Sequence, residues 1–237
     1  MSNYQDVAQN FNLENAASAL LNGSLNALNA CNECCDRHAT GDKIALYWQS
    51  KDGQKKQYTF QQLKEYSSQF ANFLKSQGVG RGDRVSGLLP RNVELLITIL
   101  AAWRIGAVYQ PLFTAFGPKA IEHRVQLAKS KFVVTDATNR PKLDDVQDCP
   151  PIISVVPASG FELPEGDLDF WNEVNAQSNQ CDVVMMQIDD PFLLMFTSGT
   201  TGLAKPLEVP LKALIAFGRY MQDAVGLTED DAFWNIA

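Results

Sequence analysis

The sequence predicts an α/β fold in which a layered, mostly parallel sheet is flanked by helices. Short apolar runs of strand length alternate along the chain with longer segments whose apolar residues recur at helical spacing. This alternation is typical of parallel strands joined by helices that cover both faces of a sheet. The chain has 237 residues, of which 46% are hydrophobic, so it can bury the core of one large or two small domains.

The first part of the chain, residues 1–40, is expected to be an N-terminal helical arm that is rich in asparagine and alanine. Four of its side chains fall on one face at helical spacing, namely Leu21, Leu25, Leu28 and Cys35. Residues 41–237 are expected to form the α/β unit.

A hairpin and a capped helix open the α/β unit. Residues 44–59 are expected to form the hairpin, because Asp52-Gly53 between two strand-like runs is a strong turn signal. Thr59 and Gln62 have the spacing of a capping box, which predicts that a helix starts there. The core-facing stripe of this helix is expected to consist of Leu63, Phe70 and Leu74.

Strands and helices then alternate to the end of the sequence. Further strands are expected at residues 85–89, 107–112, 132–135, 152–155 and 192–196. Further helices are expected at residues 93–105, 118–129, 167–176 and 212–225. Asn92 is expected to cap the first of these helices, and Gly78 to end the helix before it. Phe233 and Trp234 are expected to begin another strand.

The most informative segment is residues 193–205, where an apolar strand turns into hydroxyl residues and glycines and ends in a lysine. Glycines let an anion approach the backbone N–H groups closely, hydroxyls add donors, and lysine adds a compact positive charge. Phosphate sites in α/β folds lie at the carboxyl ends of strands, where this loop stands. The residues expected to bind a polyphosphate are Thr197, Ser198, Gly199, Thr200, Thr201, Gly202 and Lys205.

The spacing excludes a Walker loop, which needs two glycines separated by four residues and Lys-Ser/Thr directly after the second. Here Gly199 and Gly202 are separated by two residues, and Lys205 stands three residues beyond Gly202. The alternative interpretation is a surface turn after a core strand, since clusters of glycine and threonine commonly mark loops.

The order Thr-Ser-Gly-Thr-Thr-Gly-x-x-Lys after an apolar strand resembles the phosphate loop of the adenylate-forming (AMP-binding) superfamily. Further segments that resemble motifs of this family, in the expected order, are residues 58–63, 103–112, 116–121 and 132–136. Together these segments cover residues 40 to 237 and are most similar to acetyl- and medium-chain acyl-CoA synthetases. The resemblance implies that residues 41–237 are part of the N-terminal subdomain of the adenylate-forming fold.

The chain departs from the family pattern in three ways. Ala204 stands where proline is usual, and residues 206–210 replace the Gly-Val-x-x-x-His that many members have after the lysine. Members of the family are also much longer, so the chain is expected to be a truncated, N-terminal part of a synthetase. The family's ribose-binding aspartate, hinge and C-terminal catalytic lysine would follow residue 237.

The resemblance implies a ligase that activates a carboxylic acid with ATP to an acyl-adenylate and then forms a thioester with CoA. Lys205 and Thr200 are the implied catalytic residues, which hold the β- and γ-phosphates and neutralise charge on the leaving pyrophosphate. No general base is required, because the attacking carboxylate is already ionised. Mg²⁺ is implied to bridge the phosphates, with its main protein ligand after residue 237.

Three other positions have implied or alternative roles. The resemblance implies that Arg140 contacts the phosphates of CoA, with a solvated arginine as the alternative. Phe116 and Gly117 are implied to line the thiol channel or to form a structural turn. His123 is expected to be structural, because nothing nearby suggests a nucleophile that it could activate.

Two alternative functions stay open at this point. One is an adenylating enzyme that passes the acyl group to a carrier-protein thiol or to oxygen. The other is a non-catalytic fragment that keeps only phosphate binding or serves in assembly. The carboxylic acid, the oligomeric state and the activity of these residues alone are not fixed by the sequence.

The composition limits partners and compartment. The formal charge of −7 disfavours nucleic acid or an anionic membrane as the main partner. No apolar run has the length of a membrane span, and residues 1–15 lack the apolar part of a signal peptide, so a cytoplasmic protein is expected. The cluster Cys31, Cys34, Cys35 and His38 lacks a second ligand pair for zinc, so buried thiols without metal or disulfide are favoured.

Overall fold

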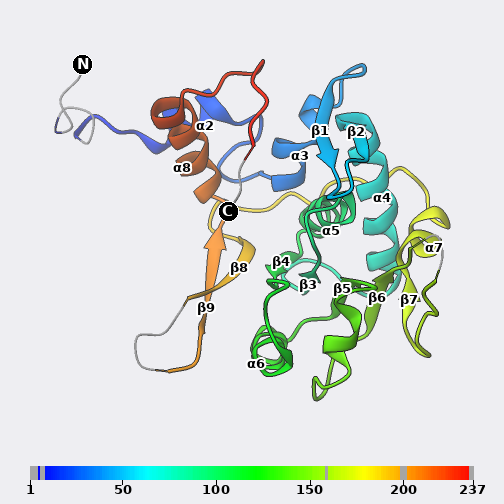
Figure 1. The fold of residues 1–237 in the computed structure, drawn as a ribbon. Helices are drawn as coiled ribbons and strands as arrows, with labels where there is room; N and C mark the ends of the chain where they lie inside the picture. The colour runs from blue at the N-terminus through cyan, green and yellow to red at the C-terminus, as the bar shows by residue number, and fades with distance from the viewer. Residues whose placement is uncertain (1–4, 6–8, 158–159, 198–201, 235–237) are drawn as a thin grey trace.

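The computed structural model describes residues 5, 9–157, 160–197 and 202–234. In this part of the chain one sheet contains the strands β3 (Arg84–Leu88), β4 (Val108–Pro111), β5 (Phe132–Asp136), β6 (Ile152–Val155), β7 (Leu168–Asp169), β8 (Pro191–Thr197) and β9 (Lys205–Pro210). Their order is β7-β6-β5-β3-β4-β8-β9 (Figure 1). Neighbouring strands are parallel, except that β9 runs antiparallel to β8 at the edge. The predicted, mostly parallel α/β sheet is therefore confirmed.

Helices cover both faces of this sheet. The helices are α4 (Phe60–Ser76), α5 (Val93–Arg104), α6 (Pro118–Ala128) and α7 (Phe170–Asn175), with the 3-10 helix η2 (Arg140–Leu143). The first core cluster joins α4, α5 and α7 to one face, and a second cluster joins α6 and η2 to the other. The predicted stripe of α4 is buried, since Leu63 is 4% exposed and Phe70 and Leu74 are 0% exposed.

A separate hairpin precedes α4. Its strands are β1 (Ile44–Gln49) and β2 (Lys55–Thr59), which pair antiparallel. The Thr59 side chain accepts a hydrogen bond from the backbone N–H of Gln62, and the Gln62 side chain accepts one from the N–H of Thr59. The predicted hairpin and capping box are both confirmed, and the box fixes where α4 begins.

The connections after β3 and β4 position the candidate site. β3 leads to α5 on one face, whereas β4, its parallel neighbour, leads to α6 on the other face. The two connecting segments therefore diverge from adjacent carboxyl ends. In open α/β sheets a ligand crevice forms where neighbouring connections diverge in this way. β8 ends at the same edge, because it runs parallel to β4.

The N-terminal segment contains α2 (Leu13–Leu20), α3 (Ala30–Cys34) and the 3-10 helix η1 (Asp36–His38). The expected helical face from Leu21 to Cys35 is wrong, because α2 ends at Leu20 and Leu28 forms a β-bridge with Met186. Cys31 and Cys35 are buried in the core against α4 and α5, which confirms the expectation that they behave as small apolar side chains.

The segment after the glycine-rich loop differs from expectation. The chain returns as β9, which contains Pro206 and Pro210 and was not predicted as a strand. Proline is tolerated there because β9 is an edge strand. A short helix, α8 (Ala213–Tyr220), then ends in a π-helical turn at Met221–Val225. The expected strand at Phe233 and Trp234 is not formed, and these residues have no regular secondary structure.

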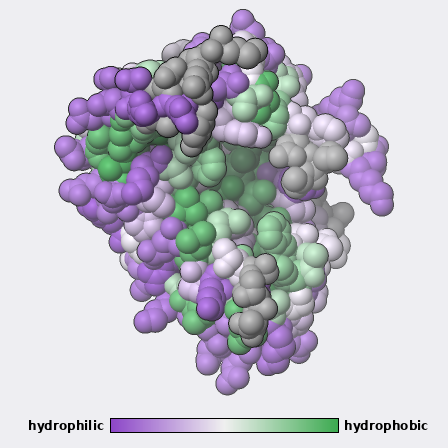
Figure 2. Space-filling view, turned by 90° about the vertical axis from the view of Figure 1, so that its left-hand side faces the viewer, coloured by the Kyte–Doolittle hydropathy of each residue, from purple (hydrophilic) through white to green (hydrophobic). Residues whose placement is uncertain are grey.

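The face that carries β9 and α8 is partly apolar. Figure 2 views this side and shows green apolar areas among polar ones. Exposed apolar side chains on these elements include Leu207, Phe217 and Tyr220. Within the described residues, every helix is too short or too polar to cross a membrane.

Candidate functional site at the carboxyl edge

β8 and β9 form the stem of the predicted phosphate loop. The residues of β8 read Pro-Phe-Leu-Leu-Met-Phe-Thr, an apolar run with Phe192 and Leu194 buried. Its last residue, Thr197, pairs with Lys205, the first residue of β9. The Thr197 hydroxyl lies 3.5 Å from the carbonyl oxygen of Lys205. We call this terminal pair, Thr197 and Lys205, the loop stem.

The predicted loop residues are only partly described. Ser198, Gly199, Thr200 and Thr201 lie outside the described residues, so their predicted phosphate contacts stay predictions. Gly202 is described and exposed. The stem brings Thr197 and Lys205 together across the ladder, while Gly202 lies in the loop between them.

Lys205 is an exposed cation at the carboxyl edge of the sheet. Its ammonium forms no ion pair or hydrogen bond with any residue that the structure describes. The other lysine of β9's neighbourhood, Lys212, is by contrast paired with Asp189 at 2.7 Å. An exposed cation beside a glycine-rich turn can pair with an anionic ligand without first breaking an internal salt bridge.

α6 lies against the stem. His123 Nε2 is 2.8 Å from the carbonyl oxygen of Ala204, which confirms the expectation of a hydrogen-bonded structural histidine. The Arg124 guanidinium stacks on the ring of Phe116 at 4.2 Å and on the ring of Phe196 at 5.4 Å. Burial lowers the pKa of Arg124. Gly117 is the N-cap residue of α6, and its two proposed roles, in the thiol channel or in a structural turn, stay predictions.

Arg140 is neither exposed nor free. It is 8% exposed, and its Nε donates to Asp167 Oδ2 at 2.5 Å while its Nη2 donates to Asp167 Oδ1 at 3.0 Å. Nη1 donates to Asp144 at 2.5 Å. Hydrogen bonding to Asp167 raises the pKa of Arg140 and outweighs the opposing effect of burial. The alternative of a solvated arginine is therefore wrong. A contact of Arg140 with CoA stays a prediction, in which a CoA phosphate would compete with the carboxylates of Asp144 and Asp167 for the guanidinium.

A cavity of about 420 Å³ lies at the carboxyl ends of β3 and β4. It is lined mainly by apolar side chains, among them Leu89, Leu95 and Phe113, with Tyr109 at its wall. Tyr109 is 3% exposed, and its hydroxyl has no hydrogen-bond partner among the described residues. Gly87 makes room for this hydroxyl, because a Cβ there would lie 2.4 Å from it. Sequence patterns gave no sign of this buried hydroxyl.

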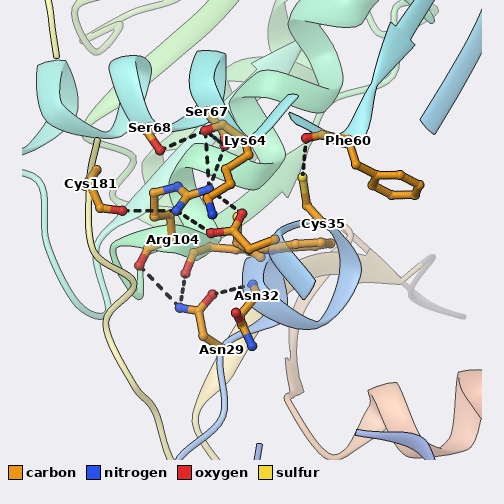
Figure 3. Close-up of polar contacts among 12 residues, drawn as sticks. Asn29, Asn32, Cys35, Phe60, Lys64, Ser67, Ser68, Arg104 and Cys181 are labelled. Carbon is orange, nitrogen blue, oxygen red and sulfur yellow. Dashed lines mark hydrogen bonds and ion pairs between the residues drawn. The ribbon is translucent and has the colours of Figure 1, made fainter. Parts of the chain in front are cut away.

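A second polar cluster lies at the opposite edge, around Arg104 at the end of α5. The Arg104 side chain is 1% exposed and donates to both carboxylate oxygens of Asp36, at 2.6 and 2.8 Å. It also donates to Ser67 Oγ at 3.0 Å and to the carbonyl of Cys181 at 3.1 Å (Figure 3). Burial, the largest single effect, lowers the pKa of Arg104, but the hydrogen bonds with Asp36 and the electrostatic effects of Asp36, Cys31 and Cys181 together outweigh it, so the pKa is raised. Its Nε lacks a partner among the described residues.

Asn29 ties the N-terminal segment to the same region. Its side-chain amide donates to the carbonyls of Trp103 and Val184, both at 2.8 Å. The carbonyl of Trp103, in the last turn of α5, also accepts from the backbone N–H of Gly106 at 3.1 Å, so Asn29 adds a second donor at this helix end. Sequence reasoning placed Arg104 in a motif but missed Asp36 and Asn29, because their partners are far away in the sequence.

Metal ligation finds no support in this geometry. In the part of the chain that the structure describes, no group of three or more His, Cys, Asp or Glu side chains is arranged to hold a metal ion. Burial raises the pKa of Cys34 to about 11 and that of Cys35 to about 12, which disfavours the thiolate that a metal would need.

The sheet order, the divergent connections and a glycine-rich hairpin at the carboxyl edge define an α/β protein of nucleotide-binding architecture. A family model described as "AMP-binding enzyme" matches residues 34–237. The chain therefore belongs to the family of AMP-binding enzymes, as the sequence motifs predicted.

Named relatives are acyl-CoA-forming enzymes. The acetyl-coenzyme A synthetase of Bacillus subtilis (strain 168) is 32% identical over 245 residues, which include 100% of this chain and 42% of the relative. The acetyl-coenzyme A synthetase of Shewanella amazonensis is 34% identical over 75% of this chain and 30% of its own length. The chain thus spans less than half the length of the relatives it matches.

Two solved structures of CoA ligases are similar to this chain. The acyl-CoA synthetase of Brucella canis is 49% identical, with a TM-score of 0.93 over 100% of this chain and 43% of that one. The anthranilate CoA ligase AuaEII, solved in complex with anthranoyl-AMP, has 21% identity and a TM-score of 0.67 over 78% of this chain and 35% of its own. The second match shows the shared fold alone.

Proposed function

We propose that this chain is part of an acyl-CoA synthetase, in which it holds the triphosphate of ATP while a carboxylate is activated. The observation that carries the proposal is the loop stem, which presents a lysine beside a threonine at the carboxyl edge of the sheet, with no ion-pair partner for the lysine among the described residues. Membership of the AMP-binding family and the names of the relatives support it.

In the proposed reaction, the substrate carboxylate attacks the α-phosphorus of ATP. The bond to the β-phosphate oxygen breaks, and pyrophosphate leaves with the electron pair. Lys205 would pair with charge that grows on the leaving group, and Thr197, Gly202 and residues 198–201 would donate hydrogen bonds to the phosphates. The second half-reaction transfers the acyl group from AMP to the thiol of CoA.

Magnesium, when bound, would neutralise negative charge on the phosphates of ATP. The described residues offer no cluster of carboxylates to hold it, so we assign no protein ligand and no step to the metal. Arg140 is proposed to contact CoA, provided that a CoA phosphate can share its guanidinium with Asp144 and Asp167.

Isothermal titration of this chain with MgATP tests the proposal. We expect binding that Lys205→Ala weakens by about tenfold or more, since a hydrogen bond to a charged group contributes about 1.5–3 kcal/mol. Lys51→Ala, an exposed lysine in the hairpin turn, serves as the matched control and should bind like the unmodified chain. If both variants bound MgATP equally weakly, the effect would come from the loss of one positive charge and not from the position of Lys205.

The same titration separates the alternatives. A chain that binds MgATP and whose binding is unaffected by Lys205→Ala would exclude the loop stem as the phosphate site. A chain that binds CoA but no nucleotide triphosphate would contradict the proposed role in activation. Binding of a phosphopantetheine-loaded carrier protein in place of CoA would favour the carrier-protein alternative.

A further inference from the structure

The imidazole of His123 contacts both sides of the loop stem, where the two sides, or arms, are the segments that lead to Thr197 and Lys205. His123 Nε2 is 2.8 Å from the carbonyl oxygen of Ala204, the residue before Lys205. The same ring packs edge-on against Phe196, the residue before Thr197, with 6.3 Å between ring centroids and an interplanar angle of 68°. His123 therefore touches the residue that precedes each member of the stem pair.

The contact with Ala204 fixes which nitrogen carries hydrogen. A carbonyl oxygen can only accept, so Nε2 must be the donor. Of the two neutral forms of the ring, only the one protonated at Nε2 makes this bond, and the cationic form makes it as well. The geometry thus assigns a tautomer that can be measured.

The stem needs an anchor on the β9 side. Pro206 follows Lys205 directly and has no backbone N–H to donate to the ladder. The Thr197 hydroxyl reaches the carbonyl of Lys205 only at 3.5 Å, a long contact. β9 also lies at the edge of the sheet, with β8 as its only neighbour in the described sheet. Besides the backbone pairing of β9 with β8, the hydrogen bond from His123 is a short polar contact that ties this side of the stem to α6.

A second contact ties the same helix to the other arm. The Arg124 guanidinium stacks on the rings of Phe116 and Phe196, and its Nη1 donates to the carbonyl of Ala120 at 2.8 Å. Successive residues of α6 therefore contact β8 at Phe196 and the residue just before β9, Ala204. Their combined effect is to fix the stem relative to the sheet.

We propose that His123 is a positioning residue that holds the Ala204 carbonyl, so that Lys205 is directed toward the triphosphate. This inference rests on the proposed function, because it assigns a purpose to the direction of Lys205. His123 itself does not touch the substrate. If the stem is not held in place, the affinity for ATP and the reaction rate fall. The contact between Lys205 and the triphosphate must then offset the entropy lost in ordering the stem.

Three variants test the inference by titration with MgATP and by urea unfolding. His123→Leu removes the donor, and His123→Gln replaces it with an amide nitrogen at a similar reach. His38→Leu is the matched control, because the chain has only 2 histidines and His38 packs against Phe60 in the N-terminal segment.

We expect His123→Leu to weaken MgATP binding about tenfold, the size of one well-made hydrogen bond. His123→Gln should stay within about threefold of the unmodified chain, and His38→Leu should bind as the unmodified chain does. The two His123 variants should unfold at similar urea concentrations. Equal loss of binding in the Leu and Gln variants, or no loss in either, would overturn the positioning role.

Nitrogen-15 NMR of the imidazoles separates this inference from the proposed function. In the His38→Leu variant a single histidine remains, so its tautomer is read without assignment. Hydrogen on Nε2 supports the contact with Ala204, and the neutral form with hydrogen on Nδ1 alone overturns it, whether or not nucleotide binds. If the unmodified chain binds no MgATP while Nε2 carries hydrogen, the proposed function fails and the contact is structural only.

Discussion

Arg104 and Lys205 lie at opposite edges of one sheet, and the surroundings of their charges differ. Arg104 is 1% exposed and is paired with Asp36 at the end where β4 begins. Lys205 is exposed at the carboxyl edge and is unpaired within the described residues. A buried charge must keep its partners to remain charged, whereas an exposed, unpaired one can bind an anion. The partners of a charge, more than its residue type, thus separate a structural role from a binding role.

The largest change in stability is expected when the buried charge of this comparison, Arg104, is removed. Arg104→Ala should lower the free energy of unfolding by about 3–5 kcal/mol, because Asp36 is then left without its partner. Urea unfolding followed by circular dichroism measures the change. Arg219→Ala is the control, since its pair with Asp223 is exposed and removing it should cost about 1 kcal/mol or less. If Arg104→Ala lowered the free energy of unfolding as little as the control does, the pair of Arg104 with Asp36 would not be important for stability.

A smaller effect of opposite sign is expected beside the candidate site. Tyr109→Phe should leave stability unchanged or raise it by about 1 kcal/mol, because the hydroxyl is buried and has no hydrogen-bond partner in the described part of the chain. The same unfolding measurement applies, with Tyr66→Phe as the comparison, because Tyr66 is only partly buried, where its ring packs edge-on against Trp171. If Tyr109→Phe instead destabilised the chain by about 1 kcal/mol or more, the hydroxyl would have a partner in solution.

Local signals in the sequence predicted most of the fold. The capping box of Thr59 and the cap of Asn92 formed as expected, because each depends on residues within one turn of helix. β9 was missed because Pro206 and Pro210 argue against a strand, and only its position at the edge makes them tolerable. The helical face from Leu21 to Cys35 failed because a bridge to Met186, far along the chain, draws Leu28 out of helical geometry.

The candidate site was predictable in composition and less so in its surroundings. The loop and Lys205 stand out in the sequence because glycine, hydroxyl and lysine follow a strand without interruption. The contact of His123 with Ala204 joins residues 81 positions apart, and that of Arg104 with Asp36 joins residues 68 apart. No local pattern reports such pairs, so only the folded chain brings them together.

The most direct test of the role of Lys205 is a comparison of half-reactions in a chimera. In it, this chain replaces the 43% of the Brucella canis acyl-CoA synthetase that it matches. Lys205→Ala should slow ATP–pyrophosphate exchange by about a hundredfold or more. Thioester formation from a preformed acyl-adenylate should change little, because pyrophosphate has already left. An equal fall in both half-reactions would contradict the account.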